Sequence, residues 1–257
     1  MSHSNGYIIG FAASVCFVCA IFVAGSAVAL KERQEVNKLL DKQKNVLSVS
    51  GHMPDDTSGD SVRATYAQYI RPKVVDLQTG QYVEGVEPST FDQREARDTP
   101  ELSRAAPAGN AAKVLRLPNH GLMYQVTSGD TVESIILPIE GKGLWSTLYG
   151  FLALAPDGST IKGLTFYEHA ETPGLGGEVD NPRWKSLWVG RKAFNDQGKV
   201  AIKVIKGSAG PVESDPHHVD GLSGATLTAR GVSASLEFWL GENGWGPYLN
   251  RIRAGGV

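Results

Sequence analysis

Cysteine is scarce in this sequence, and charge is missing from its first part. The chain has 257 residues and 2 cysteines, Cys16 and Cys19, and no Lys, Arg, Asp or Glu precedes Lys31. Because both cysteines lie in this uncharged part, the rest of the chain has no disulfide, and an oxidising compartment is neither required nor excluded.

An excess of positive charge is also missing. The chain has 25 basic and 27 acidic residues, for a net charge of −2. Nucleic-acid-binding domains usually carry a basic stripe, so we expect no nucleic-acid partner. A hydrophobic content of 41% and 30 glycines suit a globular domain with many turns, in a chain long enough for a sizeable core.

Residues 7–30 form an uncharged, mostly apolar run. A helix of this length, at about 1.5 Å per residue, can cross a hydrocarbon core of about 30 Å. A cleaved signal peptide is the alternative, and Ala27-Val28-Ala29 offers a small-residue cleavage site. The segment before the run has no Lys or Arg, however, and the run is long for a signal peptide. We therefore expect one retained transmembrane helix in a lipid bilayer.

The two cysteines have the C-x-x-C spacing of redox pairs and metal sites. In a helix they would share one face. A thioredoxin-like motif requires a βαβ context, and a zinc site requires two further ligands. Neither occurs near this apolar run, so we expect Cys16 and Cys19 to be small packing residues.

Downstream of the apolar run, the pattern predicts an α+β fold. A helical stripe continues to Gly51, and Asn181-Pro182 is predicted to begin a helix that Gly190 ends. Strands are expected at residues 73–77 and 81–86 as one hairpin, and at 122–126, 134–138 and 200–205. Two further strands, at 145–155 and 160–167, are expected on either side of a hairpin turn at Pro156-Asp157-Gly158. Hairpins with segregated helices favour an antiparallel or mixed sheet with flanking helices over a doubly wound sheet.

This pattern divides the chain into three predicted parts. Residues 1–33 are the transmembrane anchor, and residues 34–60 are a juxtamembrane helix and linker. Residues 61–257 are the extramembrane domain.

The most informative segment is Asp220-Gly221-Leu222-Ser223-Gly224-Ala225-Thr226-Leu227-Thr228. It combines one acid, three hydroxyls and two glycines, and an amphipathic helical pattern follows it. Free N–H groups and the helix dipole at a helix start favour a phosphate, whereas a cap needs only one Ser or Thr. Two explanations stay open: a phosphate site, or a cap with more hydroxyls than it needs.

Two other active-site motifs are only partly matched. Residues 221–225 nearly fit the G-x-S-x-G nucleophile elbow, but Ala225 replaces the last glycine and all six histidines precede Ser223. Gly174-Leu175-Gly176-Gly177 lacks the third glycine of a dinucleotide fingerprint, which would fall at Val179. A serine hydrolase therefore remains the runner-up among enzymes, and a tight turn is the simpler explanation of the second motif.

Histidines and acids also occur close together in two places. His217 and His218 follow Glu213 and Asp215, and His169 precedes Glu171. Neither group has the spacing of a closed metal site, and adjacent residues of an extended loop point in opposite directions. We expect solvated loops and no metal.

Residues 220–226 resemble the flavinylation motif of the membrane-anchored FMN-binding domain family. In that family a flavin transferase joins the phosphate of FMN to the threonine that follows Gly-Ala. The resemblance covers most of the chain, at Gly143-Leu144-Trp145-Ser146, at Glu171-Thr172-Pro173-Gly174-Leu175-Gly176-Gly177-Glu178 and at Phe238-Trp239-Leu240-Gly241. These segments are similar to the C subunit of the sodium-translocating NADH:quinone reductase. The G subunit of the Rnf electron-transport complex shares the Ser-Gly-Ala-Thr core.

The resemblance implies that Thr226, rather than Thr228, carries FMN through a phosphoester. Glu171 and Thr172 would then contact the edge of the flavin ring, and Leu175 would lie against its face. Lys206, which follows a predicted strand and precedes the motif, is a further candidate, from its position alone, for offsetting the phosphate charge. Trp145 is the tryptophan expected at the cofactor, and the other four are expected to be packing residues. The remaining candidate cofactor residues are Asp220, Leu222, Ser223, Gly224, Ala225, Thr228, Ser146 and Gly176, and no catalytic residue is expected.

The resemblance also implies partners. The protein would relay electrons, without a complete active site of its own, in a bacterial inner-membrane complex that oxidises NADH, reduces ubiquinone and moves sodium. Its partners would be other membrane subunits, including a second one that carries flavin, and a flavin transferase during maturation. The alternatives are an Rnf-type G subunit and a membrane-tethered binding or scaffold module without a cofactor.

Two arguments about topology disagree. Lys31, Arg33 and Lys38 follow the apolar run and no Lys or Arg precedes it, so the positive-inside rule places the large domain in the cytoplasm. The resemblance implies a periplasmic domain. We expect the periplasmic orientation, because acids are interleaved with these bases and partner subunits can decide the topology of a single helix.

Overall fold

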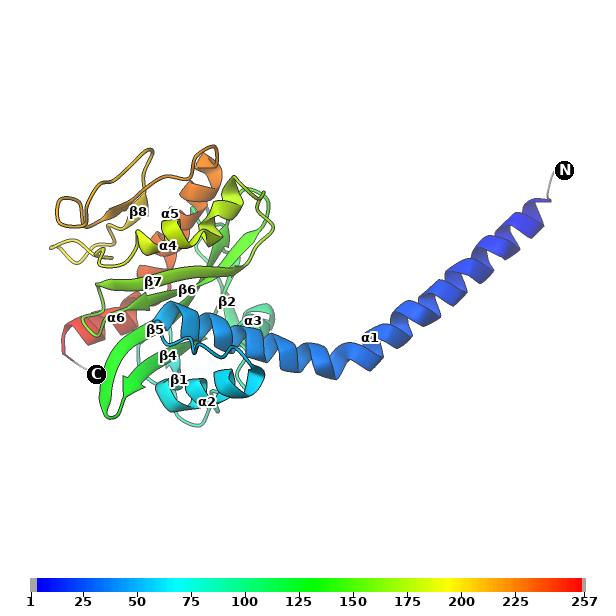
Figure 1. Cartoon of the computed structure of the whole chain (residues 1–257), viewed down its shortest axis with the longest axis horizontal. Helices are drawn as coiled ribbons and strands as arrows, with labels where there is room; N and C mark the ends of the chain where they lie inside the picture. Colours follow the sequence, from blue (N-terminus) through cyan, green and yellow to red (C-terminus); the bar gives the residue numbers. More distant parts are fainter. Residues whose placement is uncertain (1–3, 256–257) are drawn as a thin grey trace. The chain divides into compact units, whose positions relative to one another are not determined.

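The computed structural model describes residues 4–255. They form two compact units, which meet in the sequence between Gln43 and Lys44. The helices are α1 (Asn5–Ser50), α2 (Gly59–Tyr69), α3 (Gln93–Asp98), η1 (Pro100–Leu102), η2 (Gly176–Asp180), α4 (Pro182–Ser186), α5 (Thr226–Leu240) and α6 (Gly246–Arg253) (Figure 1). The strands are β1 (Ile70–Asp76), β2 (Ser103–Ala105), β3 (Arg116–Pro118), β4 (His120–Ser128), β5 (Thr131–Lys142), β6 (Thr147–Leu154), β7 (Ile161–Glu168), β8 (Lys203–Val204) and β9 (His218–Val219).

α1 contains the apolar run and continues beyond it as one helix. It is the described helix that is long and apolar enough to cross a membrane. The helix ends at Gly51, whose φ of 78° lies in the left-handed region. The N–H of His52 donates to the carbonyl of Leu47 at 3.0 Å, as in helix ends closed by glycine. The predicted stop at Gly51 is confirmed.

A five-stranded antiparallel sheet, in the order β1-β4-β5-β6-β7, is the centre of the second unit. The predicted turn at residues 156–158 joins β6 to β7, and Asp157 Oδ1 accepts the N–H groups of Ser159 at 2.9 Å and Thr160 at 2.7 Å. β8 and β9 form a separate parallel pair. The structure is therefore α+β with an antiparallel main sheet, as predicted.

Three of the predicted elements are shorter than expected, or absent. Residues 81–86 are not a strand: Tyr82 makes one isolated bridge to Val75, and β1 pairs along its whole length with β4 instead. The strand expected at 200–205 is reduced to β8, and the helix expected to run to Gly190 is reduced to α4. Apolar periodicity in a sequence reports which residues are buried, but it does not report which strands pair.

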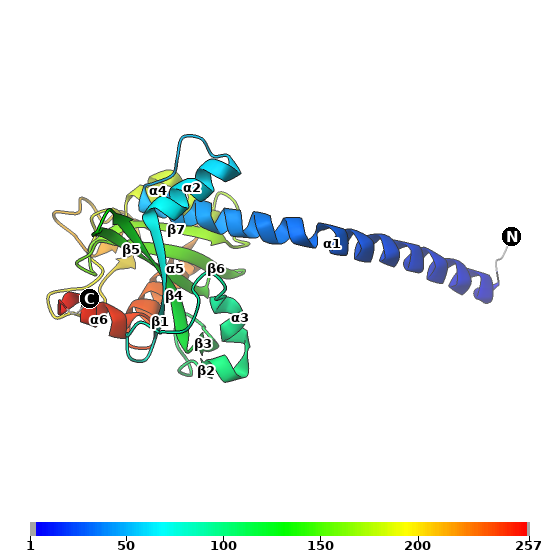
Figure 2. The same cartoon turned by 90° about the horizontal axis from the view of Figure 1, so that it is seen from below.

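Both faces of the sheet are covered, with α5 and α6 on one side and the end of α1 and α2 on the other (Figure 2). The hydrophobic core includes Leu137 and Leu152 from the sheet together with Leu236 and Trp239 from α5. On the opposite face the backbone of Gly163 approaches Val49 so closely that a Cβ would lie 2.8 Å from the Val49 carbonyl oxygen. The contacts of Leu236 and Trp239 with the sheet hold α5, whose first residue is Thr226, against the central strand β5.

Candidate cofactor-binding site

Glu171 joins three segments that are far apart in the sequence. Its Oε1 accepts the N–H groups of Trp145 at 2.9 Å and Ser146 at 3.2 Å. Its Oε2 accepts the N–H of Leu144 at 3.2 Å and the hydroxyl of Thr228 at 2.6 Å. One buried side chain therefore ties residues 143–146 and the loop at 171–177 to the first turn of α5.

Two glycines make room for this carboxylate. A Cβ at Gly143 would lie 2.6 Å from Glu171 Oε1, and a Cβ at Gly176 would lie 2.7 Å from Oε2. Burial of Glu171 raises its pKa and the four donated hydrogen bonds lower it; the net shift of the pKa is downward. Glu171 is thus an ionised internal anchor, and its expected contact with the edge of a flavin ring stays a prediction.

α5 begins at Thr226 without a side-chain cap. Its N-cap residue is Ala225, which makes no capping hydrogen bond. Ser223 and Thr226 are exposed, and within residues 4–255 neither hydroxyl has a hydrogen-bond partner. The capping explanation of the hydroxyl-rich segment is therefore wrong. A helix start whose first amides lack a side-chain acceptor is suited to an anion.

A cavity of about 620 Å³ opens beside Thr226. Arg230 lines it, although this residue was not among those predicted from the sequence. The signal was present, because Arg230 follows Thr226 by four residues and this spacing places two helical side chains on the same face. Six of the predicted cofactor residues also line the cavity: Lys206, Asp220, Leu222, Ser223, Gly224 and Thr226.

The cations of this cavity are free, and its acid is engaged. Lys206 and Arg230 are exposed, and neither makes an ion pair in the described part of the chain. Asp220 Oδ1 accepts the N–H of Ala209 at 2.8 Å, and the Ser208 hydroxyl donates to the same carboxylate at 3.2 Å. Asp220 therefore holds the adjacent loop, while Lys206 and Arg230 remain available to a bound anion.

Exposed apolar side chains lie near these polar groups. Trp145 is 66% exposed, whereas the other four tryptophans are at most 6% exposed. This contrast confirms that the other four are packing residues. Leu175 is 44% exposed and lies against Gly224, where a Cβ would be 2.8 Å from its Cδ2. Trp145 and Leu175 offer apolar surface to a planar ligand.

The other predicted residues do not line the cavity. Ala225 and Thr228 are buried, and Thr228 faces Glu171. The hydroxyl of Ser146 accepts the N–H of Ala170 at 2.7 Å, and the carbonyl of Thr172 accepts the N–H of Gly177 at 2.9 Å. The predicted residues thus form two groups: one at the cavity, and one around Glu171.

The histidine groups form local pairs. His218 Nδ1 lies 2.8 Å from Asp215 Oδ2, and His169 Nε2 lies 2.8 Å from Asp180 Oδ2 rather than near Glu171. In residues 4–255 no group of three or more His, Cys, Asp or Glu side chains could hold a metal ion.

Known proteins have sequences similar to this one. The FMN-binding domain model matches residues 143–241, which include the 143–146 segment, Glu171 and α5. The C subunit of the Na(+)-translocating NADH-quinone reductase of Yersinia pestis is 46% identical over 245 residues, which cover 95% of this chain and 91% of that protein. The corresponding protein of Pseudomonas aeruginosa is 47% identical over 243 residues, covering 94% and 93%.

Solved structures share the fold. NqrC of Shewanella oneidensis has a TM-score of 0.77 at 37% identity, and the match covers 86% of this chain and 99% of that one. The corresponding protein from Parabacteroides distasonis has a TM-score of 0.65 at 25% identity, covering 86% and 96%. The similarity extends over almost the whole length of these relatives. The chain therefore belongs to the NqrC family, the C subunits of the Na(+)-translocating NADH-quinone reductase, and it contains an FMN-binding domain.

Proposed function

We propose that this protein carries one FMN, bonded through its phosphate to Thr226 Oγ1, and relays electrons within a sodium-translocating NADH-quinone reductase. The observation that carries the proposal is the state of Thr226. It is the exposed first residue of an uncapped helix, its hydroxyl has no partner in the described chain, and it shares a cavity with Lys206 and Arg230.

These residues suit a phosphate group. Lys206 and Arg230 supply positive charge, and the first amides of α5 supply hydrogen-bond donors and the positive end of the helix dipole. The Asp220 carboxylate lines the same cavity and holds the loop at residues 208–209, and it forms no ion pair with Lys206 or Arg230 in the described residues. The Ser223 hydroxyl, exposed in the same cavity, is a further donor to the phosphate.

The flavin itself supplies one- and two-electron transfer when bound. A phosphoester leaves the flavin ring unmodified, so the reduction potential depends on what surrounds the ring. Trp145 and Leu175 provide apolar contacts, with Thr172 as a polar neighbour. Glu171 acts indirectly, because it fixes the backbone on which Trp145 is carried. A tether also keeps the relay flavin in place in every redox state.

Mass spectrometry of the denatured chain tests the attachment. We expect the chain, produced together with a flavin transferase, to gain the mass of one FMN less one water, as a phosphoester requires, with the added mass on the peptide that contains Thr226. An adduct on Thr228, or flavin that is lost completely on denaturation, would contradict the proposal.

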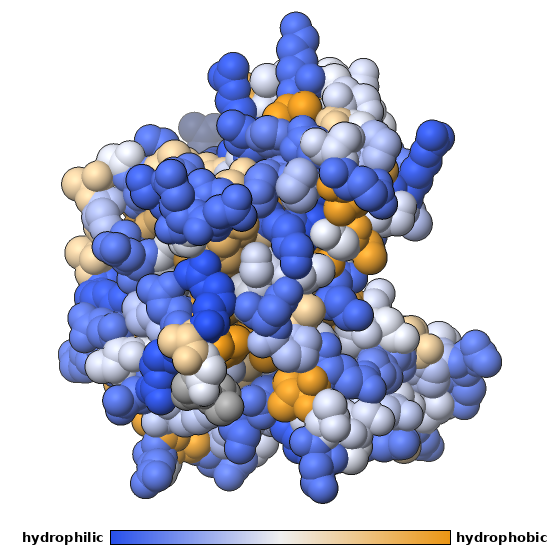
Figure 3. Space-filling view, turned by 90° about the vertical axis from the view of Figure 1, so that its left-hand side faces the viewer, coloured by the Kyte–Doolittle hydropathy of each residue, from blue (hydrophilic) through white to orange (hydrophobic). Residues whose placement is uncertain are grey.

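We further propose that α1 anchors the protein in the inner membrane and that residues 61–257 face the periplasm, next to the other subunits of the complex. Figure 3 shows a face of the molecule on which hydrophilic residues predominate and hydrophobic residues form small, separate patches. Such a surface is that of a water-exposed domain.

Labelling of a single cysteine tests the orientation. Asp130 lies in the turn between β4 and β5 and is exposed, whereas Ser159 in the next hairpin is only partly exposed. In a chain with Cys16 and Cys19 replaced by Ala, we expect an impermeant maleimide to label Asp130→Cys in intact spheroplasts. Labelling only after lysis would place the domain in the cytoplasm.

A further inference from the structure

A second cavity lies apart from Thr226, between α3, residues 113–116 and the ends of β5 and β6. Its volume is about 280 Å³. It shares no lining residue with the cavity at Thr226. The proposed attachment of FMN does not use this second cavity, which we name the α3 cavity.

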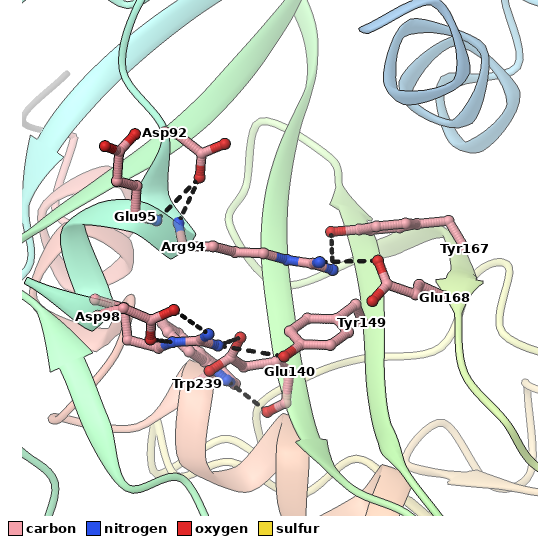
Figure 4. Close-up of polar contacts among 10 residues, drawn as sticks. Asp92, Arg94, Glu95, Asp98, Glu140, Tyr149, Tyr167, Glu168 and Trp239 are labelled. Carbon is pink, nitrogen blue, oxygen red and sulfur yellow. Dashed lines mark hydrogen bonds and ion pairs between the residues drawn. The ribbon is translucent and has the colours of Figure 1, made fainter. Parts of the chain in front are cut away.

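The two acids of the α3 cavity are already paired with one arginine. Arg97 donates to Asp98 at 2.8 and 3.2 Å and to Glu140 at 2.8 Å. Figure 4 shows Asp98 and Glu140 in this network, beside Tyr149. One of these two negative charges neutralises Arg97, and in the net charge of the cavity the other neutralises one of the remaining cations.

Three further cations line the α3 cavity, and none of them contacts an acid in residues 4–255. Arg116 donates to the hydroxyl and the carbonyl of Ser103, at 2.9 and 3.1 Å. Lys142 Nζ donates to the carbonyl of Trp145 at 2.9 Å. Lys113 has no side-chain partner in the described residues. The lining thus carries four positive and two negative charges.

The backbone of Lys113 has a left-handed conformation, which is unfavourable for a residue with a side chain. Its φ is 57°, and within residues 4–255 every other residue with a positive φ is a glycine. Asn110 holds the turn from both sides: its Oδ1 accepts the N–H of Val114 at 3.0 Å, and its Nδ2 donates to the Val114 carbonyl at 2.8 Å. Backbone strain that surrounding contacts maintain is concentrated at ligand sites.

We propose that the α3 cavity binds a phosphate group, either free or on an anionic lipid headgroup. Arg116 and the two lysines supply charge-assisted donors, the contacts that phosphate oxygens prefer. The volume exceeds that of one phosphate, and Leu115, which is 84% exposed, offers apolar contact to an attached group. Because Lys142 also holds the Trp145 carbonyl, the bound phosphate and the 143–146 segment share one lysine.

Lysine acetylation in the full chain, solubilised in detergent and read out by peptide mass spectrometry, tests this site directly. Pyrophosphate is the probe for free phosphate. We expect millimolar pyrophosphate to slow the acetylation of Lys113 and Lys142 by about threefold or more, since a paired ammonium is a poorer nucleophile. Lys162 and Lys199, exposed and outside both cavities, are the internal controls, and Lys206 reports separately on the cavity at Thr226.

Variants make the test specific to this cavity. Arg116→Gln should raise the pyrophosphate concentration needed for half-protection of Lys113 roughly tenfold, by loss of a charge-assisted contact. Arg183→Gln, an exposed arginine outside the α3 cavity, should leave that concentration unchanged. If Arg116→Gln fails to fold, Lys113→Gln with Lys142 as the reporter replaces it, because the exposed Lys113 side chain holds no other element.

Nanodiscs distinguish the two sources of phosphate. Protection in phosphatidylglycerol discs but not in phosphatidylcholine discs, with none by pyrophosphate, would identify a lipid headgroup. Protection by pyrophosphate would identify a free phosphate compound. Equal slowing at Lys162 and Lys199, no protection by any probe, or protection that Arg116→Gln leaves intact would overturn the proposal.

Discussion

Two threonines in the first turn of α5 have opposite surroundings. Thr226 is exposed, lines the cavity with Lys206 and Arg230, and its hydroxyl has no partner within residues 4–255. Thr228 is fully buried and donates to the Glu171 carboxylate at 2.6 Å. The two residues have the same chemistry and are separated by one position, so surroundings alone distinguish them.

This difference indicates that the Thr226 hydroxyl is available for a reaction, whereas the Thr228 hydroxyl supports the structure. A hydroxyl that accepts a phosphoryl group has to be accessible and unengaged, as Thr226 is. A buried hydroxyl whose loss would leave a carboxylate short of a donor contributes to stability instead. Thr228 therefore keeps α5 attached to the loop that carries Trp145, while Thr226 remains free to react.

The largest effect is expected from a substitution at Thr226. We expect Thr226→Ala to remove covalent flavin completely while the domain stays folded, because this side chain makes no capping bond and its loss costs at most about 1 kcal/mol. Flavin fluorescence on a denaturing gel measures the attachment, and thermal unfolding measures the fold. A fluorescent band that persists in this variant would exclude Thr226 as the attachment residue.

Glu171→Gln tests the buried side of the comparison. The NH2 group of glutamine would face the N–H and hydroxyl groups that now donate to the Glu171 carboxylate, and two donors cannot form a hydrogen bond. We therefore expect the free energy of unfolding at pH 7 to fall by roughly 2–3 kcal/mol. Tryptophan fluorescence should shift as well, because the carboxylate holds the N–H of Trp145. Glu237→Gln, at an exposed position on α5, is the matched control and should change stability by less than about 0.5 kcal/mol.

The direction of the pKa shift fixes how this difference depends on pH. The pKa of Glu171 is lower in the folded chain than the ordinary pKa of a glutamate, so its contribution is complete well above that ordinary pKa and is lost as pH falls through the folded pKa. Denaturation at pH 7 and in the acid range below about pH 4 measures this. A gap between wild type and Glu171→Gln that is the same at both would contradict an ionised, stabilising Glu171.

Thr228→Val tests the role of the buried hydroxyl, because valine has nearly the same shape as threonine but no hydroxyl. The substitution removes one donor from a buried carboxylate, so we expect a loss of roughly 1–2 kcal/mol in the free energy of unfolding, with covalent flavin retained. The same substitution at Thr226 should do the reverse: it should leave stability almost unchanged and remove the flavin. Equal effects of the two substitutions on stability would show that the distinction is wrong.

The smallest expected effect is at Arg230. We expect Arg230→Gln to slow flavin attachment about threefold to fivefold at limiting transferase, because an exposed ion pair with phosphate contributes about 1 kcal/mol or less. Arg183→Gln, exposed and outside the cavity, controls for a general loss of positive charge. If both variants load alike, the cavity cation does not assist the phosphate.

Local patterns were sufficient for some of the site. The Gly-rich, hydroxyl-rich segment before an amphipathic pattern located the start of α5, and the resemblance selected Thr226 within it. The hairpin turn at 156–158 and the helix stop at Gly51 were also predicted, because turn chemistry and glycine conformation are properties of a few adjacent residues.

Long-range contacts were not predictable in this way. Nothing in the sequence around Glu171 indicates that its carboxylate accepts bonds from residues 144–146 and from Thr228, since those partners lie 25 or more positions away. The same limitation applies to residues 81–86, which have a strand pattern, while β1 found a longer partner in β4. Arg230 was missed although its spacing from Thr226 was visible.

The sequence by itself determined the apolar helix, the α+β class and the segment that begins α5, since each depends on local composition or on periodicity along the chain. Only the tertiary structure decided which threonine is exposed, that Glu171 is an internal anchor and that the cations of two separate cavities lack partners. Burial and pairing arise when the sheet brings distant residues together, and the environment of a hydroxyl or a charge, rather than its identity, sets what it can do.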